Sequence, residues 1–260
     1  MQTITPIRNR SQGFTLVEMA IVLMIVGLLL GGMLVPLSAQ MEQRNVTETR
    51  KQLDEIQQAL LGFAIVNGRL PCPADRTTPT GGTNAALIPA GQEYKDPITG
   101  SCAAAIVFGN NAVGVLPWAT LGLNETDAWG RRYTYQVTAN WADGPPQPDG
   151  TGAAGCNATV GVSFQLCSSS NQNILNTVGG TSLTPNNVPA VIVSHGKNGA
   201  GAYTQQGIQL PVSSDADEQE NSNGTLSFVS KSPTPTFDDL VVWISPNILL
   251  NRMVAAGKLP

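Results

Sequence analysis

The sequence predicts an α+β fold in which a long N-terminal helix packs on an antiparallel sheet with extended loops. The first observation is a run without charged residues from Met19 to Ala39. The second is that apolar residues continue at helical spacing as far as Val66, before a stop at Asn67-Gly68. The third is a series of short apolar or alternating segments separated by turn-rich linkers. One long helix followed by short strands is typical of the α+β class.

The first part of the helix is expected over residues 14–39, as a membrane-spanning segment. A helix rises ~1.5 Å per residue, so this run is long enough to cross a bilayer core of ~30 Å. Arg8 and Arg10 precede the run, and no acidic residue lies near them. The positive-inside rule therefore places residues 1–13 in the cytoplasm and the rest of the chain across the membrane.

The second part of the helix is expected over residues 40–67 and is amphipathic. Gly31-Gly32 and Pro36, in the first part, predict a kink or local melting there. A short apolar stripe in the second part fits either a coiled-coil stalk or packing onto the following domain, and its brevity favours packing. The stripe consists of Val46, Leu53, Ile56, Leu60 and Phe63.

A globular domain is expected over residues 68–260. It begins with an irregular, Thr-, Gly- and Pro-rich loop at Arg76–Gly100 and ends with a short helix at Asn247–Ala256, for which Ser245-Pro246 supplies a cap and a first-turn proline. Alternation or continuous apolar character predicts four strands between them: Arg131–Val137, Val160–Leu166, Ala190–Ser194 and Leu240–Ser245.

Composition argues against several functional classes. The net charge is −4, and an acidic chain disfavours general nucleic-acid binding. Ser194 and His195 are adjacent, so on a strand their side chains point to opposite faces and cannot act as nucleophile and base. No nucleophile elbow or phosphate-binding loop is present, so we predict no enzymatic activity. His195 is expected in a turn or at the surface, and Trp141 either in the core or exposed to a ligand.

All four cysteines, Cys72, Cys102, Cys156 and Cys167, follow the apolar run and would therefore lie in an oxidising compartment. Four cysteines allow three connectivities. Pairing of sequence neighbours closes the shorter loops and favours Cys72–Cys102 and Cys156–Cys167. A zinc site is the alternative, but the cysteines form no C-x-x-C pair, and the single histidine lies far along the chain.

The stretch Gly13-Phe14-Thr15-Leu16-Val17-Glu18 places a carboxylate in the first turn of the apolar helix. An acid inside a membrane segment is costly and requires a physical reason. The stretch resembles, residue by residue, the processing signal of type IV pilins and of the pseudopilins of type II secretion. The resemblance also covers the long apolar helix and its amphipathic extension.

The resemblance implies a path of maturation. A prepilin peptidase would cleave after Gly13, and the new amino terminus at Phe14 would be N-methylated. In a filament, the Glu18 carboxylate would meet the Phe14 amine of a neighbouring subunit, so that one buried charge satisfies another. The expected partners are the peptidase, other pilin or pseudopilin subunits and an inner-membrane assembly platform. The expected location is the bacterial inner membrane, then a periplasmic or extracellular filament.

Two further stretches are similar to major pseudopilins. The segment Asp127–Tyr133 is similar to their D-x-W-G-x-x-Y hairpin entry, and Val193–Gly199 to their S-x-G-x-x-G strand and turn. In those proteins an acidic loop after this turn binds calcium. The resemblance implies carboxylate ligands here, although the spacing is less compact and an acidic solvated loop is the alternative. The candidates are Asp215, Asp217, Glu218, Glu220, Asp238 and Asp239.

The predicted function is therefore that of a structural subunit of a type IV pilus-like filament. The length and the Leu70-Pro71-Cys72-Pro73 stretch, which is outside the pseudopilin pattern, favour a minor pilin. The alternatives are a pseudopilin of a type II secretion system and a filament-borne adhesin whose loops bind a ligand. The sequence leaves open the filament type, the position in the filament and any ligand.

Overall fold

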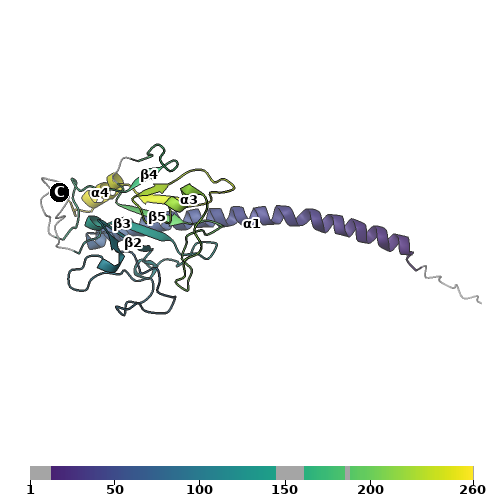
Figure 1. The fold of residues 1–260 in the computed structure, drawn as a ribbon, viewed down its shortest axis with the longest axis horizontal. Helices are drawn as coiled ribbons and strands as arrows, with labels where there is room; N and C mark the ends of the chain where they lie inside the picture. The colour runs from purple at the N-terminus through teal and green to yellow at the C-terminus, as the bar shows by residue number, and fades with distance from the viewer. Residues whose placement is uncertain (1–12, 145–160, 185–187, 260) are drawn as a thin grey trace, which may run out of the picture. The chain divides into compact units, whose positions relative to one another are not determined.

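The structure is a computed structural model that describes residues 13–144, 161–184 and 188–259, with the backbone alone for residues 30–37. The chain divides into two compact units, Met1–Arg44 and Asn45–Pro260. Helix α1 (Leu16–Asn67) is a single α-helix that begins in the first unit and ends in the second (Figure 1). The predicted long helix is thus confirmed.

The predicted local melting of α1 does not occur, because the helix continues without a break through Gly31-Gly32 and Pro36. A proline removes one hydrogen bond from the helical ladder, and the leucines and methionines around it are strong helix formers. The helical propensity of the flanking residues therefore outweighs the low helical propensity of the two glycines and the proline.

A five-stranded antiparallel sheet is the centre of the second unit (Figure 1). Its spatial order is β1-β2-β3-β5-β7, so β1 and β7 lie at the two edges. Ile192 of β5 lies opposite Tyr135 of β3 on one side and Val242 of β7 on the other. The strands are β1 (Val107–Phe108), β2 (Asn111–Val115), β3 (Thr134–Thr138), β5 (Ala190–Ser194) and β7 (Leu240–Ile244).

One face of this sheet packs against the second half of α1. Leu53, Ile56 and Leu60 of the predicted stripe are buried in one cluster with Tyr135 and Ile192. Complete burial of such side chains stabilises the fold by roughly 1.5–3 kcal/mol each. The stripe therefore packs onto the domain, as predicted.

The other face of the sheet is covered by a two-stranded parallel sheet, formed by β4 (Asn173–Leu175) and β6 (Ser227–Val229). Ile174 and Phe228 from this pair are buried in one cluster with Val191 and Val193 of β5. Alternation along β5 sends these valines to one face and Ile192 to the other. The second unit thus has three layers, of which the sequence predicted two.

Short helices complete the unit. Helix α4 (Pro246–Ala255) confirms the predicted closing helix, although the Ser245 side chain makes no capping hydrogen bond. Its Leu249 and Met253 are buried in the core shared with α1. The other short helices are α2 (Trp118–Leu121), α3 (Ala216–Glu220) and the 3-10 turns η1 (Ala104–Ile106) and η2 (Ala139–Trp141).

Two of the four strand predictions need correction. Strand β3 begins at Thr134, three residues after the predicted start, because Arg131 closes the preceding turn and Arg132 forms isolated bridges with Thr126 and Tyr203. Residues 161–166 form no strand. The Ser163 N–H donates instead to the Gly68 carbonyl just beyond α1, at 2.9 Å. The alternation in this segment reflects burial of Val162 and Phe164, without a neighbouring strand.

The cysteine and tryptophan predictions have separate outcomes. Cys72 and Cys102 form a disulfide, as predicted. Cys156 lies outside the described residues, so the Cys156–Cys167 pair stays a prediction. Trp141 is fully buried and stacks on Phe164 with ring centroids 4.6 Å apart, so the idea of an exposed ligand contact is wrong.

Candidate functional site

The start of α1 has the geometry of a capping box. The Glu18 carboxylate accepts hydrogen bonds of 2.8 Å from both the N–H and the hydroxyl of Thr15. In return the Glu18 N–H donates to the Thr15 hydroxyl at 3.2 Å. Each side chain thus satisfies a backbone group that the first helical turn leaves without an intrahelical partner. Glu18 therefore has a local role in the isolated subunit.

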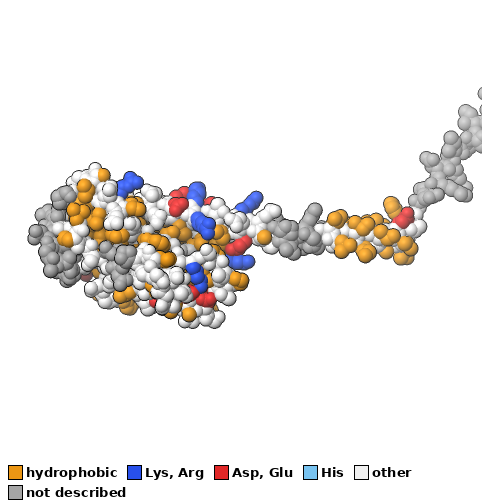
Figure 2. Space-filling view, turned by 90° about the horizontal axis from the view of Figure 1, so that it is seen from above, with side chains coloured by type: hydrophobic (Ala, Val, Ile, Leu, Met, Phe, Trp, Pro, Cys, Tyr) orange, Lys and Arg blue, Asp and Glu red, His pale blue; other side chains and the backbone are white. Residues whose placement is uncertain are grey.

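The helix that follows this box has an apolar surface. Figure 2 shows hydrophobic side chains gathered along this stretch, and the exposed ones run from Phe14 to Leu29. Contiguous exposed apolar surface on this scale marks a site of association. Within the described residues, no helix combines the length and the apolar character that crossing a membrane requires.

The two pseudopilin-like stretches of the globular unit meet at one carboxylate. One oxygen of Asp127 accepts from the N–H groups of Trp129 and Arg131, at 3.0 and 2.9 Å. The other accepts from the Ser194 hydroxyl at 2.6 Å. Burial raises the pKa of Asp127, against the lowering effect of these hydrogen bonds. These contacts make Asp127 and Ser194 structural residues that hold the turn before β3 against the end of β5.

Three of the predicted acidic residues come together. One carboxylate oxygen from each of Glu218, Asp238 and Asp239 lies within 4.8 Å of the others. Asn198 donates to Glu218 at 2.8 Å, and Asn221 donates to Asp239 at 2.8 Å. Burial and the charges of the neighbouring carboxylates raise the pKa of Asp239 well above its ordinary value. We call Glu218, Asp238 and Asp239 the acidic cluster.

The chemistry of the acidic cluster fits a hard divalent cation. Asp239 is 2% exposed, and its Oδ1 atom has no hydrogen-bond partner in the described part of the chain. An unpartnered buried carboxylate oxygen is costly, and three converging carboxylates repel one another. Calcium takes oxygen ligands of this kind, so Glu218, Asp238 and Asp239 are the residues that would hold it.

The other predicted ligands have different contacts. Asp215 is the N-cap of α3, where its carboxylate accepts the Asp217 N–H at 2.9 Å. Asp217 accepts from the Val178 N–H at 2.7 Å and forms an ion pair with Lys231. Glu220 accepts from Thr225 at 2.8 Å and does not join the acidic cluster. These three residues organise the loop around the cluster.

His195 lies beside the acidic cluster, and its carbonyl accepts the Gly199 N–H at 2.9 Å at the start of a turn. Of its two predicted positions, a turn or the surface, the surface position is wrong. The residue is fully buried, because it follows β5 directly into the core of the unit. Its Nε2 is 2.8 Å from the Thr134 hydroxyl, and its Nδ1 is 3.8 Å from Asp239 Oδ1. Burial lowers the pKa of His195 to about 4, so the ring is neutral at physiological pH.

Two asparagines of this site were not predicted from the sequence. Asn198 belongs to the S-x-G-x-x-G turn, so its place beside Glu218 could have been inferred from the motif. Asn221 carried no such signal. It donates to Asp239 and also to the Val229 carbonyl at 3.0 Å, which fixes β6 relative to the acidic cluster.

Comparison with known proteins identifies the N-terminal stretch. Residues 8–34 match the family described as the prokaryotic N-terminal methylation motif. No curated protein and no solved structure matches the chain. The motif is the N-terminus of type IV pilins and pseudopilins, and here it precedes a pilin-like α+β fold.

The motif implies a type IV pilin-like or pseudopilin subunit, a class of structural proteins that generally lack enzymatic activity. It further implies processing by a prepilin peptidase and assembly with other pilins. The match ends at residue 34, so the globular unit contributes to this identification only through its fold.

Proposed function

We propose that this protein is a minor pilin, a structural subunit of a type IV pilus-like filament. The observation that carries the proposal is the methylation motif at residues 8–34. The long amphipathic helix packed on an antiparallel sheet supports it, because a filament subunit needs a helix for the filament core and a folded domain outside it.

In this proposal the subunit is inserted in the bacterial inner membrane through the uncharged stretch within residues 14–39, with its leader in the cytoplasm. A prepilin peptidase cleaves after Gly13 and the Phe14 amine is methylated. An inner-membrane assembly platform then moves the subunit from the bilayer into the filament. Its destination is periplasmic or extracellular.

Glu18 changes its partners in this sequence of events. In the free subunit its carboxylate is satisfied by the N–H and hydroxyl of Thr15. In the filament it also faces the positive Phe14 amine of a neighbouring subunit. The capping box supports this proposal because it holds the carboxylate at the start of the helix, four residues from the processed terminus.

Mass spectrometry of the mature protein from its host tests the proposal. We expect an N-terminal peptide that begins with methylated Phe14. A terminus at Met1, or cleavage near Ala39, would contradict the assignment, because the first indicates no processing and the second indicates a secretory signal peptide. Gly13→Ile provides a control, since blocked cleavage should keep the leader and prevent incorporation into filaments.

The acidic cluster favours a second candidate, a pseudopilin of a type II secretion system that binds calcium. The convergence of Glu218, Asp238 and Asp239 and the unpartnered Asp239 Oδ1 support this candidate. Co-purification distinguishes the two: a pilus subunit is recovered in sheared surface pili, whereas a pseudopilin stays with the cell envelope and its loss blocks the export of secreted enzymes.

A further inference from the structure

The outer edge of β7 has backbone groups that are open to a partner. The Trp243 carbonyl accepts a 3.0 Å hydrogen bond from the Gln57 side chain, so it points away from β5. In an antiparallel pair, alternate residues direct their N–H and C=O groups to the same side. The N–H and C=O of Val241 and the N–H of Trp243 therefore also point outward.

Apart from the Gln57 contact, this edge lacks the features that usually protect a sheet edge. Natural edge strands are blunted by charged residues, prolines, bulges or a covering segment. The β7 sequence Leu240-Val241-Val242-Trp243-Ile244 contains no charged residue, proline or glycine, and it pairs with β5 without a bulge. An apolar edge of five residues is a template for strand addition unless a partner covers it.

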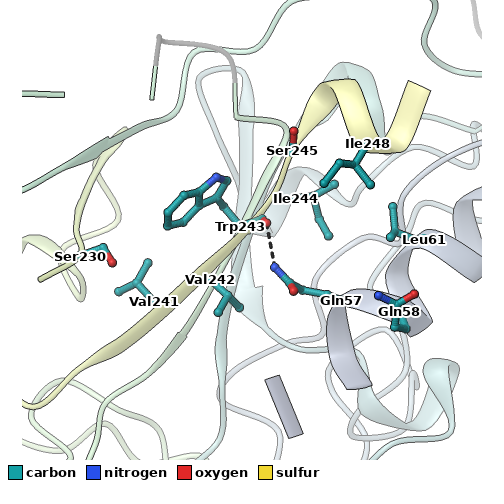
Figure 3. A pocket seen from close by; sticks show the side chains of 10 residues that line it. All are labelled: Gln57, Gln58, Leu61, Ser230, Val241, Val242, Trp243, Ile244, Ser245 and Ile248. Atoms are coloured by element: carbon teal, nitrogen blue, oxygen red, sulfur yellow. Dashed lines mark hydrogen bonds between the residues drawn. The ribbon is translucent and has the colours of Figure 1, made fainter. Parts of the chain in front are cut away.

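A groove runs along the edge (Figure 3). Its volume is about 480 Å³ beside Trp243, where α1, β7 and α4 form the walls. Leu61, Ile244 and Ile248 give this end an apolar lining, and Gln58 lies at its rim on α1. A second hollow of about 450 Å³ adjoins the Leu240 end of the same strand.

The two ends of the groove differ in charge. The Trp243 end has no charged lining residue, whereas the charged residues at the Leu240 end are Arg50, Asp54, Lys231 and Asp239. Antiparallel pairing of two β7 edges would place the charged end of one copy against the apolar end of the other. That mismatch disfavours a second copy of this chain. It favours an extended segment with apolar side chains at one end and a charged side chain at the other.

We propose that the groove receives an extended segment of a different filament subunit, which adds to the β7 edge as a further strand. This inference rests on the proposed function. Helix α1, through which the subunits assemble in that proposal, forms one wall of the groove, so the site is continuous with the assembly surface. The added strand bonds to the outward N–H and C=O of Val241 and to the N–H of Trp243, whose carbonyl already accepts from Gln57, and one of its apolar side chains enters the space beside Ile248.

Photocross-linking in the host tests the proposal with the full-length protein. A benzophenone amino acid replaces Gln58, and cross-linked peptides are identified by mass spectrometry. We expect a cross-link to a non-helical segment of another filament subunit. A cross-link to a second copy of this chain or to an exported polypeptide, or no cross-link from wild-type-level filaments, would overturn the inference.

Two variants test strand addition itself. Val241→Pro removes an outward N–H and leaves the β5 ladder intact, so it should lower the cross-link yield by roughly tenfold or more. The matched Val241→Ala, which keeps the N–H, should stay within about twofold. Equal yields from Val241→Pro and Val241→Ala would overturn the inference.

If Val241→Pro does not fold, the cross-link yield of Ile248→Glu tests the groove instead. Ile208→Glu is the control outside the groove. Both isoleucines are exposed, at 53% and 63% respectively. Only Ile248→Glu should reduce the cross-link, and equal effects would overturn the inference. Absence of the wild-type protein from filaments is a separate result, because it contradicts the proposed function before the groove is tested.

Discussion

The hydroxyl of Ser194, at the end of β5, donates a 2.6 Å hydrogen bond to the carboxylate of Asp127, which lies 67 residues earlier in the chain. The same carboxylate binds two N–H groups of the turn that leads into β3. One buried carboxylate therefore orders a turn and attaches it to the central sheet.

Replacement of Ser194 by alanine should destabilise the protein. The variant removes a donor from a buried carboxylate, a loss of about 1–3 kcal/mol in the free energy of unfolding. Denaturant unfolding of the full chain in detergent measures it. Ser232→Ala, at an exposed position, is the control and should change stability by no more than ~0.5 kcal/mol. Equal stability of the two variants would show that the Asp127–Ser194 bond is not structural.

The buried ion pair between Arg69 and Glu93 supports a prediction on pH. Arg69 donates two hydrogen bonds of 2.8 Å to the Glu93 carboxylate. Burial opposes ionisation of Glu93, but the hydrogen bonds and charge of Arg69 outweigh it and hold the carboxyl pKa below 4.5. The stability that this lowered pKa contributes is fully present above pH 4.5 and is lost as the pH falls through the lowered pKa.

Glu93→Gln should remove this part of the pH dependence and cost roughly 3–5 kcal/mol at pH 7, because Arg69 is left buried without its counterion. The double variant Arg69→Met with Glu93→Leu should recover much of the loss. Unfolding free energies between pH 7 and 3 provide the measurement. A parallel decline of wild type and Glu93→Gln over this range would contradict the prediction.

The Cys72–Cys102 disulfide closes a loop across a sequence separation of 30 residues. In the chain-entropy model a disulfide that closes a loop of this size stabilises the folded state by about 3–4 kcal/mol. Replacing both cysteines by alanine should therefore lower the unfolding free energy by that amount. Reductant should then destabilise the double variant less than it destabilises the wild type. Equal sensitivity to reductant would indicate that this disulfide does not stabilise the fold.

The start of α1 has two roles, capping of the helix and the proposed charge pairing with a neighbouring Phe14 amine. Variants of Glu18 and Thr15 separate them. Glu18→Ala should leave membrane insertion intact and lower incorporation into filaments by about tenfold, or ~1.4 kcal/mol, since the neighbouring Phe14 amine loses its partner. Thr15→Ala removes only the cap and should have a smaller effect. Quantitative immunoblots of membranes and sheared filaments provide the comparison. If both variants assembled like wild type, the charge-pairing account would be wrong.

Calcium binding at the acidic cluster predicts a shift in thermal stability. A ligand that binds the folded state raises the unfolding free energy by about 2.7 kcal/mol at a concentration 100 times its Kd. The full chain in detergent should therefore melt at a higher temperature with calcium than with chelator. Asp239→Asn should abolish the shift, whereas Asp217→Asn, outside the cluster, should keep it. A shift that survived in Asp239→Asn would place the ion elsewhere.

Much of the fold follows from local patterns, and the failures have identifiable physical causes. The helix was predictable because its apolar spacing and the Asn67-Gly68 stop are local. Strand β2 was not predicted, since Asn111–Val115 contains a glycine and has no alternation. Its strand conformation depends on pairing with β3. The segment 161–166 alternates like a strand, but its Ser163 N–H bonds to the Gly68 carbonyl beyond the helix end.

The sequence by itself determined the long helix and its methylation motif, and it favoured the Cys72–Cys102 pair that the structure shows. Which carboxylates converge depends on the tertiary structure alone. Glu218 lies close to Asp238 and Asp239, whereas Asp217 forms an ion pair with Lys231. The tertiary structure also decided that the β7 edge stays open beside α1. Periodicity is a local property that one segment carries, whereas a site or an edge depends on the packing of distant segments.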